Sequence, residues 1–465
     1  MQVYSVADPN KTREPDVSLP SDAQALFNRL WAVWNDRRAE NAVKVAYYNA
    51  EQPVKNLNIT IPPGMANRVQ SRCDWARMAV DYLANRSVFE GFAFADSDNE
   101  NEAVIDEIVA GNDLPDIYDG ATRAELICSP AFLTVSAGFA GEPQAVIRAY
   151  SATESAALWN ERKRRVEAAF TVVSSDDRGE PDAYNLYTED AVVEVWKVDG
   201  FWKYKEHPHN HGRPLIEPLR YRWDTWAPFG HSRVSKTVRD LVDAARANEI
   251  YTAVASEFYS APQRYLLGAD EDIFEGTTKW EAYIGNIFAV TRDENGNVPT
   301  YGQLPQMTLE PLLARRRDLA KQLSGVTGVP MQSLGVVSDS NPTSYEAMHM
   351  AENDIVIEAE HLNRSNGQAM ANVARLALAI AKGKPVTQLD ATESSVFSVF
   401  ANPQRPSLSQ RSDFAMKTAS IYPAYVETSV FKEDMGWDAA TRQRLENEEK
   451  LINGRRTLQG IIGND

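Results

Sequence analysis

The chain has 465 residues and a formal net charge of −17, so it is long enough to bury several hydrophobic cores, while its acidity argues against general nucleic-acid binding. Hydrophobic residues make up 43% of the sequence and charged residues 24%, which is ordinary for a folded soluble protein. This length favours two to four domains. The acidic excess most simply provides solubility.

The two cysteines, Cys73 and Cys128, lie in apolar stretches and lack C-x-x-C spacing. We therefore expect buried free thiols and assembly in a reducing compartment. Residues 1–17 have no apolar core of the kind that signal peptides carry, and no run reaches the roughly eighteen apolar residues of a membrane span. We expect no contact with a membrane.

The first third of the chain alternates between helical and strand patterns. A helix is predicted over 21–53, with an apolar face formed by Leu26, Leu30, Trp31, Val33 and Trp34. Residues 66–94 predict a helix that ends in a short apolar strand, and residues 100–127 have an acidic, helical pattern. Residues 133–138 and 145–151 alternate as strands do.

Residues 148–219 predict an antiparallel β meander, with strands over 166–175, 184–200 and 201–207. A basic run, Arg162 to Arg165, stands in otherwise acidic sequence. We interpret it as a solvated strand edge that deters pairing with other strands.

His207, His209 and His211 form the one cluster of metal-ligand residue types in the chain. Alternating histidines on a strand would share one face. Pro208 and Gly212 favour a loop instead, and no carboxylate or cysteine at the usual spacing completes a site. We therefore expect no metal site, although the sequence does not show whether this cluster binds anything.

The central region reads as two helices separated by a small inserted module. Residues 233–264 predict the first helix. Residues 262–305 break the helical pattern and predict a hairpin or small α/β module with a turn at Asn295-Gly296. A short basic helix follows over 311–323 and is predicted to end at Ser324-Gly325.

A polar loop over 334–344 then leads into a helix of roughly forty residues that stops at Gly383. Its small or apolar positions mostly step by three and four and predict one continuous packing face: Met348, Ala351, Ile355, Ala359, Leu362, Ala369, Val373, Leu376 and Ile380. Such a length suggests a spine that crosses a large body, or a helix packed beside copies of itself. The stretch from Val396 predicts one returning strand, and residues 406–465 predict helices with charged faces.

The order of these signals resembles the portal proteins of tailed bacteriophages, in the siphophage-type branch. The motifs after the second helix carry the resemblance most specifically: Thr327-Gly328-Val329-Pro330, Leu334-Gly335, residues 338–344 and the helix opening TSYEAM. The outline of the first helix matches at Gly230, Ser232, Asp243, Ala244, Glu257, Pro262 and Arg264. A tyrosine pair, Tyr47-Tyr48, follows the first helix as in portals, with Ala50 where the family usually has glycine.

The resemblance implies an α+β portal fold. Its parts would be a wing over 1–230, a first stem helix over 231–261, a small α/β clip over 262–305 and a second stem helix over 306–325. Residues 326–384 would form the tunnel loop and long spine helix, 385–404 a returning wing strand, and 405–465 a helical crown.

The resemblance also implies a function, that of a ring at one capsid vertex, dodecameric in the virion, through which double-stranded DNA is packaged and ejected. Such a ring is assembled in the host cytoplasm and contacts major capsid and scaffold proteins. Its clip meets the large terminase subunit first and the head–tail adaptor protein later. The acidity of the chain fits this role, because a channel through which DNA slides should not hold phosphates tightly.

Two groups of residues are the candidate DNA contacts that this resemblance implies. The basic residues of the stem helices are Lys236, Arg239, Arg246, Arg315, Arg316, Arg317 and Lys321. Because residues 315–317 fan around a helix by about 100° each, they cannot all face a channel, and we expect one or two to reach phosphate and the others to pair with acidic neighbours across the subunit seam. The tunnel loop would be Val336, Val337, Ser338, Asp339, Ser340 and Asn341, whose small polar residues suit brief contacts to phosphate.

Motifs of catalysis and cofactor binding are missing from the sequence. There is no Walker loop, no G-x-S-x-G, no H-E-x-x-H and no G-x-G-x-x-G, and acidic pairs such as Asp176-Asp177 lie in predicted turns. We therefore expect no catalytic residues and no cofactor. Two alternatives stay open: a carboxylate-dependent α+β hydrolase, since spacing alone does not exclude separated carboxylates, or a non-portal virion or scaffold protein.

Overall fold

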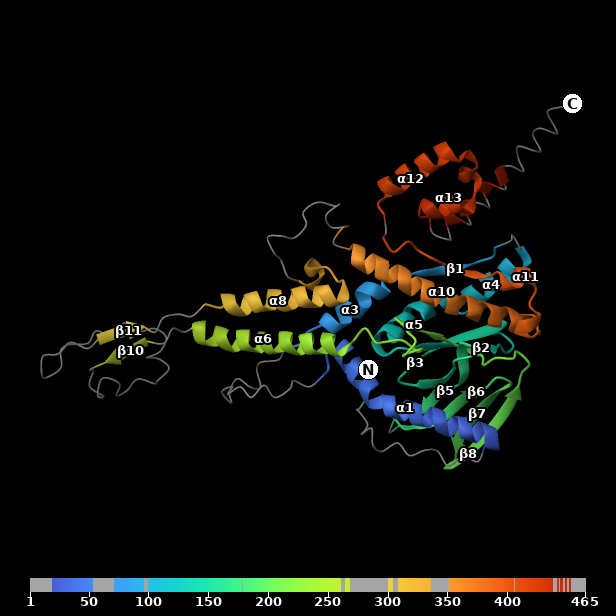
Figure 1. Cartoon of the computed structure of the whole chain (residues 1–465), viewed down its shortest axis with the longest axis horizontal. Helices are drawn as coiled ribbons and strands as arrows, with labels where there is room; N and C mark the ends of the chain where they lie inside the picture. Colours follow the sequence, from blue (N-terminus) through green and yellow to red (C-terminus); the bar gives the residue numbers. More distant parts are fainter. Residues whose placement is uncertain are drawn as a thin grey trace, which may run out of the picture.

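The computed structural model describes residues 19–52, 71–95, 99–177, 179–260, 264–267, 300–303, 308–335, 350, 352–404, 406–437, 441–442, 444–445, 448–449 and 451–452. Figure 1 shows a mixed body of helices and sheets, a pair of helices that projects from it, and a C-terminal helical group. The prediction of a mixed α+β chain is confirmed.

The largest sheet has five antiparallel strands in the order β4-β5-β6-β7-β8. Their bounds are β4 Ser155–Asn160, β5 Arg165–Ser175, β6 Pro181–Tyr187, β7 Ala191–Val198 and β8 Phe201–Pro208. The meander is therefore present, but the single strand predicted over 184–200 is wrong. Thr188 turns the chain there, because its hydroxyl both donates to the Ala191 carbonyl and accepts from the Ala191 N–H. β4 was not predicted.

The basic run at 162–165 is a turn between β4 and β5, so the interpretation as a solvated strand edge is wrong. Arg165 begins β5, an interior strand of the sheet. Lys163 and Arg165 both pair with Glu189, at 2.7 and 3.2 Å, and Arg165 also donates to the Gly212 carbonyl. The run fixes the turn through these contacts.

Two smaller sheets complete the body. β2 (Ala131–Ala137) pairs with β3 (Ala145–Ser151) on one side and β9 (Ile216–Leu219) on the other, so β3 and β9 are opposite edges of this sheet. β1 (Phe89–Ala93) pairs antiparallel with β12 (Phe397–Phe400), the predicted returning strand. This pairing ties the C-terminal part of the chain to its first third.

α1 (Ser21–Tyr48) covers the five-stranded sheet through Phe27, Leu30, Trp31 and Trp34, which pack with Phe170 and Tyr184. Val33 was predicted on this apolar face but is 40% exposed, and Phe27 takes its place. α1 ends at Tyr48, and Ala50, two residues later, adopts a φ of +53°. This left-handed conformation explains why glycine is usual there in the portal pattern.

The long helix α10 (Asn353–Ala381) crosses the body and contributes to three of the four hydrophobic clusters of the described chain. It packs on α3 (Trp75–Ala84), α4 (Asn99–Gly111), α5 (Leu114–Cys128) and the three-stranded sheet. Ile355, Ala359, Leu362, Ala369, Val373 and Leu376 are buried, as the predicted packing face requires. The predicted beginning of this helix, 343–349, lies outside the described residues. The short helices around Val386–Gln388 and α11 (Ala391–Ser394) follow it.

α6 (Lys236–Ser260) and α8 (Glu310–Thr327) are the two predicted central helices and project together from the body (Figure 1). Beyond them, β10 (Arg264–Leu267) and β11 (Thr300–Gln303) pair antiparallel, while the predicted turn at Asn295-Gly296 lies outside the described residues. The prediction that α8 ends at Ser324-Gly325 is wrong. Gly328, with a φ of +68°, ends it three residues later by donating its N–H to the Ser324 carbonyl.

The C-terminal group contains α12 (Leu408–Ile421), a 3-10 turn at Pro423–Glu427 and α13 (Ser429–Asp434). Another 3-10 turn, Met331–Leu334, follows α8.

In the described part of the chain, Cys73 and Cys128 are free and buried, as predicted. None of the helices described is long and apolar enough to cross a membrane.

Candidate functional site

The helix pair α6–α8 is anchored to the body at one end and lightly covered at the other. Near the body, Val238, Leu241 and Val242 of α6 pack in one cluster with Leu319, Ala320 and Leu323 of α8. Further out, residues 310–318 of α8 are all exposed except Leu312, which is half-buried. The outer part of α8 therefore has no core of its own within the described chain.

Three of the predicted basic residues on these helices are exposed and have no ion pair among the described residues: Lys236, Arg315 and Lys321. The others are constrained. Arg316 lies 3.8 Å from Glu249 and Arg317 lies 2.9 Å from Glu310. Arg239 is half-buried. Two of the three consecutive arginines thus pair with acidic residues of the same chain, whereas the expected pairs lay across the subunit seam.

Arg246 corrects the expectation that it faces DNA. Its side chain is 6% exposed, and its guanidinium donates to the Ser71 and Gln52 carbonyls at distances of 3.1–3.2 Å. These bonds hold the segments on either side of residues 53–70 to α6. Because a buried guanidinium needs its acceptors, Arg246 is a structural residue.

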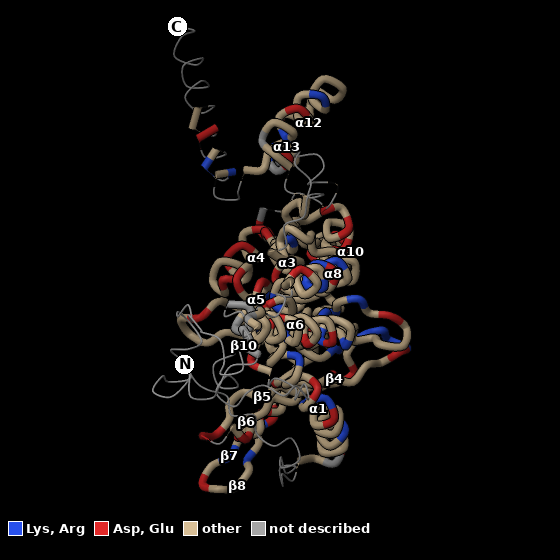
Figure 2. Tube along the Cα trace, turned by 90° about the vertical axis from the view of Figure 1, so that its left-hand side faces the viewer, with Lys and Arg blue, Asp and Glu red and all other residues tan. Residues whose placement is uncertain are grey.

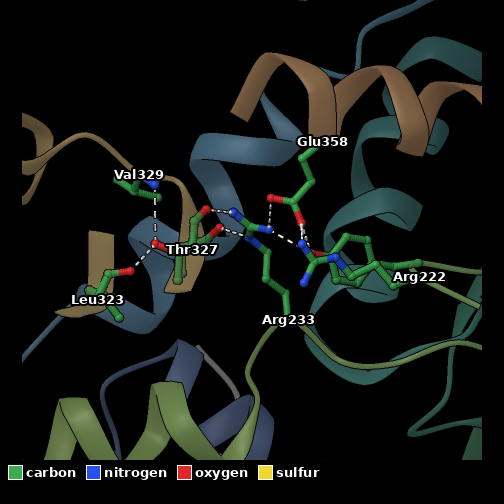
Figure 3. Close-up of polar contacts among 8 residues, drawn as sticks. Arg222, Arg233, Leu323, Thr327, Val329 and Glu358 are labelled. Carbon is green, nitrogen blue, oxygen red and sulfur yellow. Dashed lines mark hydrogen bonds and ion pairs between the residues drawn. The ribbon is translucent and has the colours of Figure 1, made fainter. Parts of the chain in front are cut away.

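The base of the helix pair is organised by Arg233, a residue that the sequence analysis did not single out. Figure 3 shows its guanidinium between α10 and the end of α8. Arg233 forms an ion pair with Glu358 of α10 at 2.7 Å, and it donates to the Ala79 and Thr327 carbonyls. One buried side chain therefore joins the entry of α6 to α3, to the end of α8 and to α10.

Glu358 is shared between two arginines and a tyrosine. Arg222 approaches it at 2.8 Å (Figure 3), and the Tyr221 hydroxyl donates to its carboxylate. Burial, more than any neighbour, raises the pKa of Tyr221 to about 12, so its hydroxyl stays protonated as a donor. The sequence signal for this network is weak, because an arginine before one helix and a glutamate on another have no fixed spacing.

Gly230 and Ser232, which the portal pattern includes, position Arg233. Gly230 has a φ of +81°, and a Cβ there would lie 2.3 Å from the Tyr221 carbonyl oxygen. The Ser232 hydroxyl donates to the Ile127 carbonyl, and the Arg233 N–H donates to the Leu126 carbonyl. The motif therefore attaches the entry of α6 to the end of α5.

A cavity of about 700 Å³ lies beside this junction. Its lining includes Arg222, Trp223, Asp354, Glu358 and His361. The carboxylate of Glu358 is held in the ion pairs that join α6 to α10, so its contacts are those of a structural residue.

A second unusual carboxyl, Glu125, has a pKa raised to about 8 by burial, and it is fully enclosed between α5 and α10.

The remaining predicted site residues are placed as follows. His207 lies on β8, one residue before the end of the strand, with its Nε2 3.1 Å from Glu194. His209 and His211 lie in the next loop with ring centroids 5.5 Å apart. Among the residues that the structure describes, no group of three or more His, Cys, Asp or Glu is placed to hold a metal ion. The predicted tunnel loop, 336–341, lies outside the described residues.

Known proteins match this sequence over nearly the whole chain. A family model described as "Phage portal protein, SPP1 Gp6-like" matches residues 28–423. The portal protein of Mycobacterium phage L5 is 25% identical, with 97% of this chain and 94% of that protein covered. The portal protein of Mycobacterium phage D29 is also 25% identical, with 96% and 93% covered.

Among solved structures, a chain from a virion of a native gene transfer agent particle covers 83% of this chain and 92% of its own length, with 13% identity and a TM-score of 0.47. The sequence matches carry the assignment. Because the family model spans the chain from α1 to the C-terminal helical group, this chain belongs to the phage portal protein family.

Proposed function

We propose that this portal protein closes into a ring, dodecameric in the virion, at one capsid vertex, and that double-stranded DNA passes through its centre during packaging and ejection. The outer part of α8 carries this proposal. Its residues 310–318 are almost all exposed in the single chain, including the apolar Leu313. Copies of the α6–α8 pair packed side by side would cover it, as heterologous contacts in a cyclic ring require.

The parts of the chain then take the roles of a portal subunit. Residues 1–230 and 385–404 would form the wing, 231–261 and 306–325 the stem helices, and 262–305 the clip. Residues 326–384 would supply the tunnel loop and spine, and 405–465 the crown. The projecting position of β10 and β11 beyond the stem helices (Figure 1) supports a clip that is accessible to other proteins.

The channel would be lined by a small number of cations. Lys236, Arg315 and Lys321 are the best candidates, because they are exposed and have no ion pair in the described part of the chain. Each phosphate contact strengthens DNA binding and makes it salt-dependent. Few contacts per subunit, together with a tunnel loop of small polar residues at 336–341, would let DNA slide.

The clip would dock the large terminase subunit during packaging and the head–tail adaptor protein afterwards, and the wing would meet major capsid and scaffold proteins. Assembly would take place in the host cytoplasm. As a member of a structural family, the protein would act as a passive conduit while the motor supplies the energy.

The first test is negative-stain microscopy of the purified chain with a mass measured by light scattering. Rings with an axial hole and a mass near twelve times 51.9 kDa are expected. A small dimer with a closed cleft would contradict the ring.

The role of the channel is tested by complementing a portal-deficient phage and measuring nuclease-protected DNA. Replacing Lys236, Arg315 and Lys321 by glutamine should change the amount of nuclease-protected DNA, while rings still form. A control triple at the exposed Arg37, Lys203 and Lys205, away from the stem helices, should package as the unmodified protein does. Equal effects of the two triples would contradict the assignment of channel-lining residues.

A further inference from the structure

Trp226 is the most exposed large hydrophobic side chain in the described part of the chain, at 93%. It lies in the loop between β9 and α6, and hydrogen bonds to Asp224 hold the backbone of this loop. One Asp224 oxygen accepts the N–H groups of Trp226 and Ala227, both at 2.8 Å, and the other lies 2.8 Å from His231 Nε2. An exposed indole in a fixed turn has the form of an interface anchor, because little freedom is lost on binding.

The surroundings of Trp226 are basic and aromatic. The stretches 162–165 and 220–223 contain six Lys and Arg residues and no acidic residue. Lys163 and Arg165 pair with Glu189, and Arg222 pairs with Glu358, so the cations without an ion pair among the described residues are Arg162, Arg164 and Arg220. Arg220 lies over the rings of both Trp159 and Trp223, and Arg164 also lies over Trp223. This flank, the two stretches with Trp226, is called the donor flank below. It needs a partner that is apolar at the centre and acidic around it.

The same chain carries such a surface elsewhere. A shallow groove of about 420 Å³ runs between α5 and β3, lined by Ile117, Gly120, Ala121, Ala149 and Tyr150, with Asp116 and Arg148 beside them. Residues 99–120, which include α4 and the start of α5, contain seven acidic residues and no Lys or Arg. Asp106, Glu107, Asp113 and Asp116 are exposed there. This groove with its acidic border is called the acceptor flank.

The two flanks lie on opposite sides of the subunit. The groove borders β3, and the loop that carries Trp226 follows β9. These two strands are opposite edges of one sheet. Residues 220–223 of the donor flank also line a cavity with Asp354, Glu358, His361 and Ser365 of α10. In contrast, α4 packs against Ala374 and Leu378 of α10. At about 100° per residue these two sets occupy roughly opposite faces of α10. In Figure 2, which looks along the projecting helices, α4 and α5 lie to one side of α6, and α8 and α10 to the other.

We propose that the indole of Trp226 docks into the groove between α5 and β3 of the next copy of this chain, with the donor arginines facing its acidic border. The inference rests on the proposed ring and names the contact that closes it. Complementary flanks on opposite sides of one subunit give a head-to-tail contact, and repetition of that contact produces a ring. Opposite charges orient the encounter, and the buried indole supplies most of the affinity.

The test is disulfide trapping in assembled rings. Thr225→Cys, at the exposed residue next to Trp226, and Gly120→Cys are combined in one chain, so the indole is kept. A Cβ at Gly120 meets no atom within 4 Å, so the second change is tolerated. Burial raises the pKa of Cys73 to about 11 and of Cys128 to about 12, so both native thiols are poorly reactive. Oxidation should give a ladder of covalent multimers on a non-reducing gel, and each single variant should give only monomers.

A second measurement is the protein concentration at which rings form. Trp226→Ala should raise it by about tenfold or more. Phe201→Ala, at an aromatic side chain that is 74% exposed on β8, should leave it unchanged. Rings of the double-cysteine protein without a ladder, or unchanged assembly of Trp226→Ala, would overturn this inference and leave the portal ring intact. If the unmodified protein forms no rings, it is the proposed function that fails.

Discussion

Arg233 and Glu358 form an ion pair, with 2.7 Å between Nη1 and Oε2, that joins the entry of the first projecting helix to the long helix of the body. Arg233 is 5% exposed and has further acceptors in the Ala79 and Thr327 carbonyls (Figure 3). Four separate segments therefore meet at one guanidinium. A force on α6 or α8 during passage of DNA would reach the body through this side chain.

Replacing Arg233 by methionine should destabilise the folded chain by about 3–5 kcal/mol, because the Ala79 and Thr327 carbonyls lose their buried donor and Glu358 loses its buried cation. Urea unfolding measures the free energy. Hydrogen exchange should also show faster opening at the end of α8, whose Thr327 carbonyl loses its donor.

The matched control is Arg222→Met. Arg222 contacts the same carboxylate at 2.8 Å, but its side chain is 63% exposed. Its loss should cost no more than about 1 kcal/mol. If the two variants lose equal stability, the burial of Arg233 is not what makes the junction strong.

Gly230→Ala should destabilise the chain, because the φ of +81° is unfavourable for alanine and the added Cβ would lie 2.3 Å from the Tyr221 carbonyl oxygen. The left-handed conformation alone costs about 1–2 kcal/mol. Gly120→Ala is the control, since its Cβ meets nothing within 4 Å and alanine favours the helix by about 1 kcal/mol. Thermal unfolding should therefore move in opposite directions for the two variants. Equal shifts would contradict this reading of Gly230.

Periodicity predicted most of the helices and the face of α10, because these depend on local pattern. It failed where a side chain decides the turn. Nothing in the strand pattern over 184–200 marks the break, which the hydroxyl of Thr188 creates. Likewise Ser324-Gly325 resembles a helix end, but the left-handed conformation that ends α8 is adopted by Gly328.

The candidate site was predictable in outline only. Family motifs located the two projecting helices, and the sequence ranked all seven basic residues alike. Burial separates them, since Arg246 is enclosed with backbone acceptors whereas Lys236, Arg315 and Lys321 are exposed. Arg233 and Glu358 escaped notice because residues far apart in sequence are joined by tertiary packing, which no local pattern encodes.

Glu125 should make stability fall as the pH rises. Burial raises its pKa from 4.5 to about 8, although the amide of Asn366 and the charge of Arg220 act against the rise. Between these two pH values the unfolded chain has lost the proton that the folded chain still holds. Unfolding therefore releases about one proton, and the free energy of unfolding falls as the pH rises. Glu125→Gln should match the unmodified protein near pH 4.5 and become progressively more stable than it up to about pH 8. Asp116→Asn, at an exposed carboxylate, should show no such trend.

Glu393 should make stability fall as the pH falls, in a lower pH range than Glu125. Burial alone would raise its pKa, but hydrogen bonds from Lys382 and Lys384 prevail and lower it from 4.5 to about 2. The ionised carboxylate therefore stabilises the fold fully above about pH 4.5, and this contribution is lost as the pH falls towards 2. Urea midpoints measured between these values should fall more steeply for the unmodified protein than for Glu393→Gln, whose amide oxygen can still accept the Asp390 N–H.

Lys384→Met provides the control for that last comparison. It removes one of the two ammonium groups while Lys382 stays 2.7 Å from the carboxylate. The folded-state pKa of Glu393 should then lie between about 2 and 4.5, so the loss of stability should begin at the same pH and end at a higher one. An acid profile that is identical in all three proteins would show that the buried ion pairs of Glu393 do not govern stability in acid.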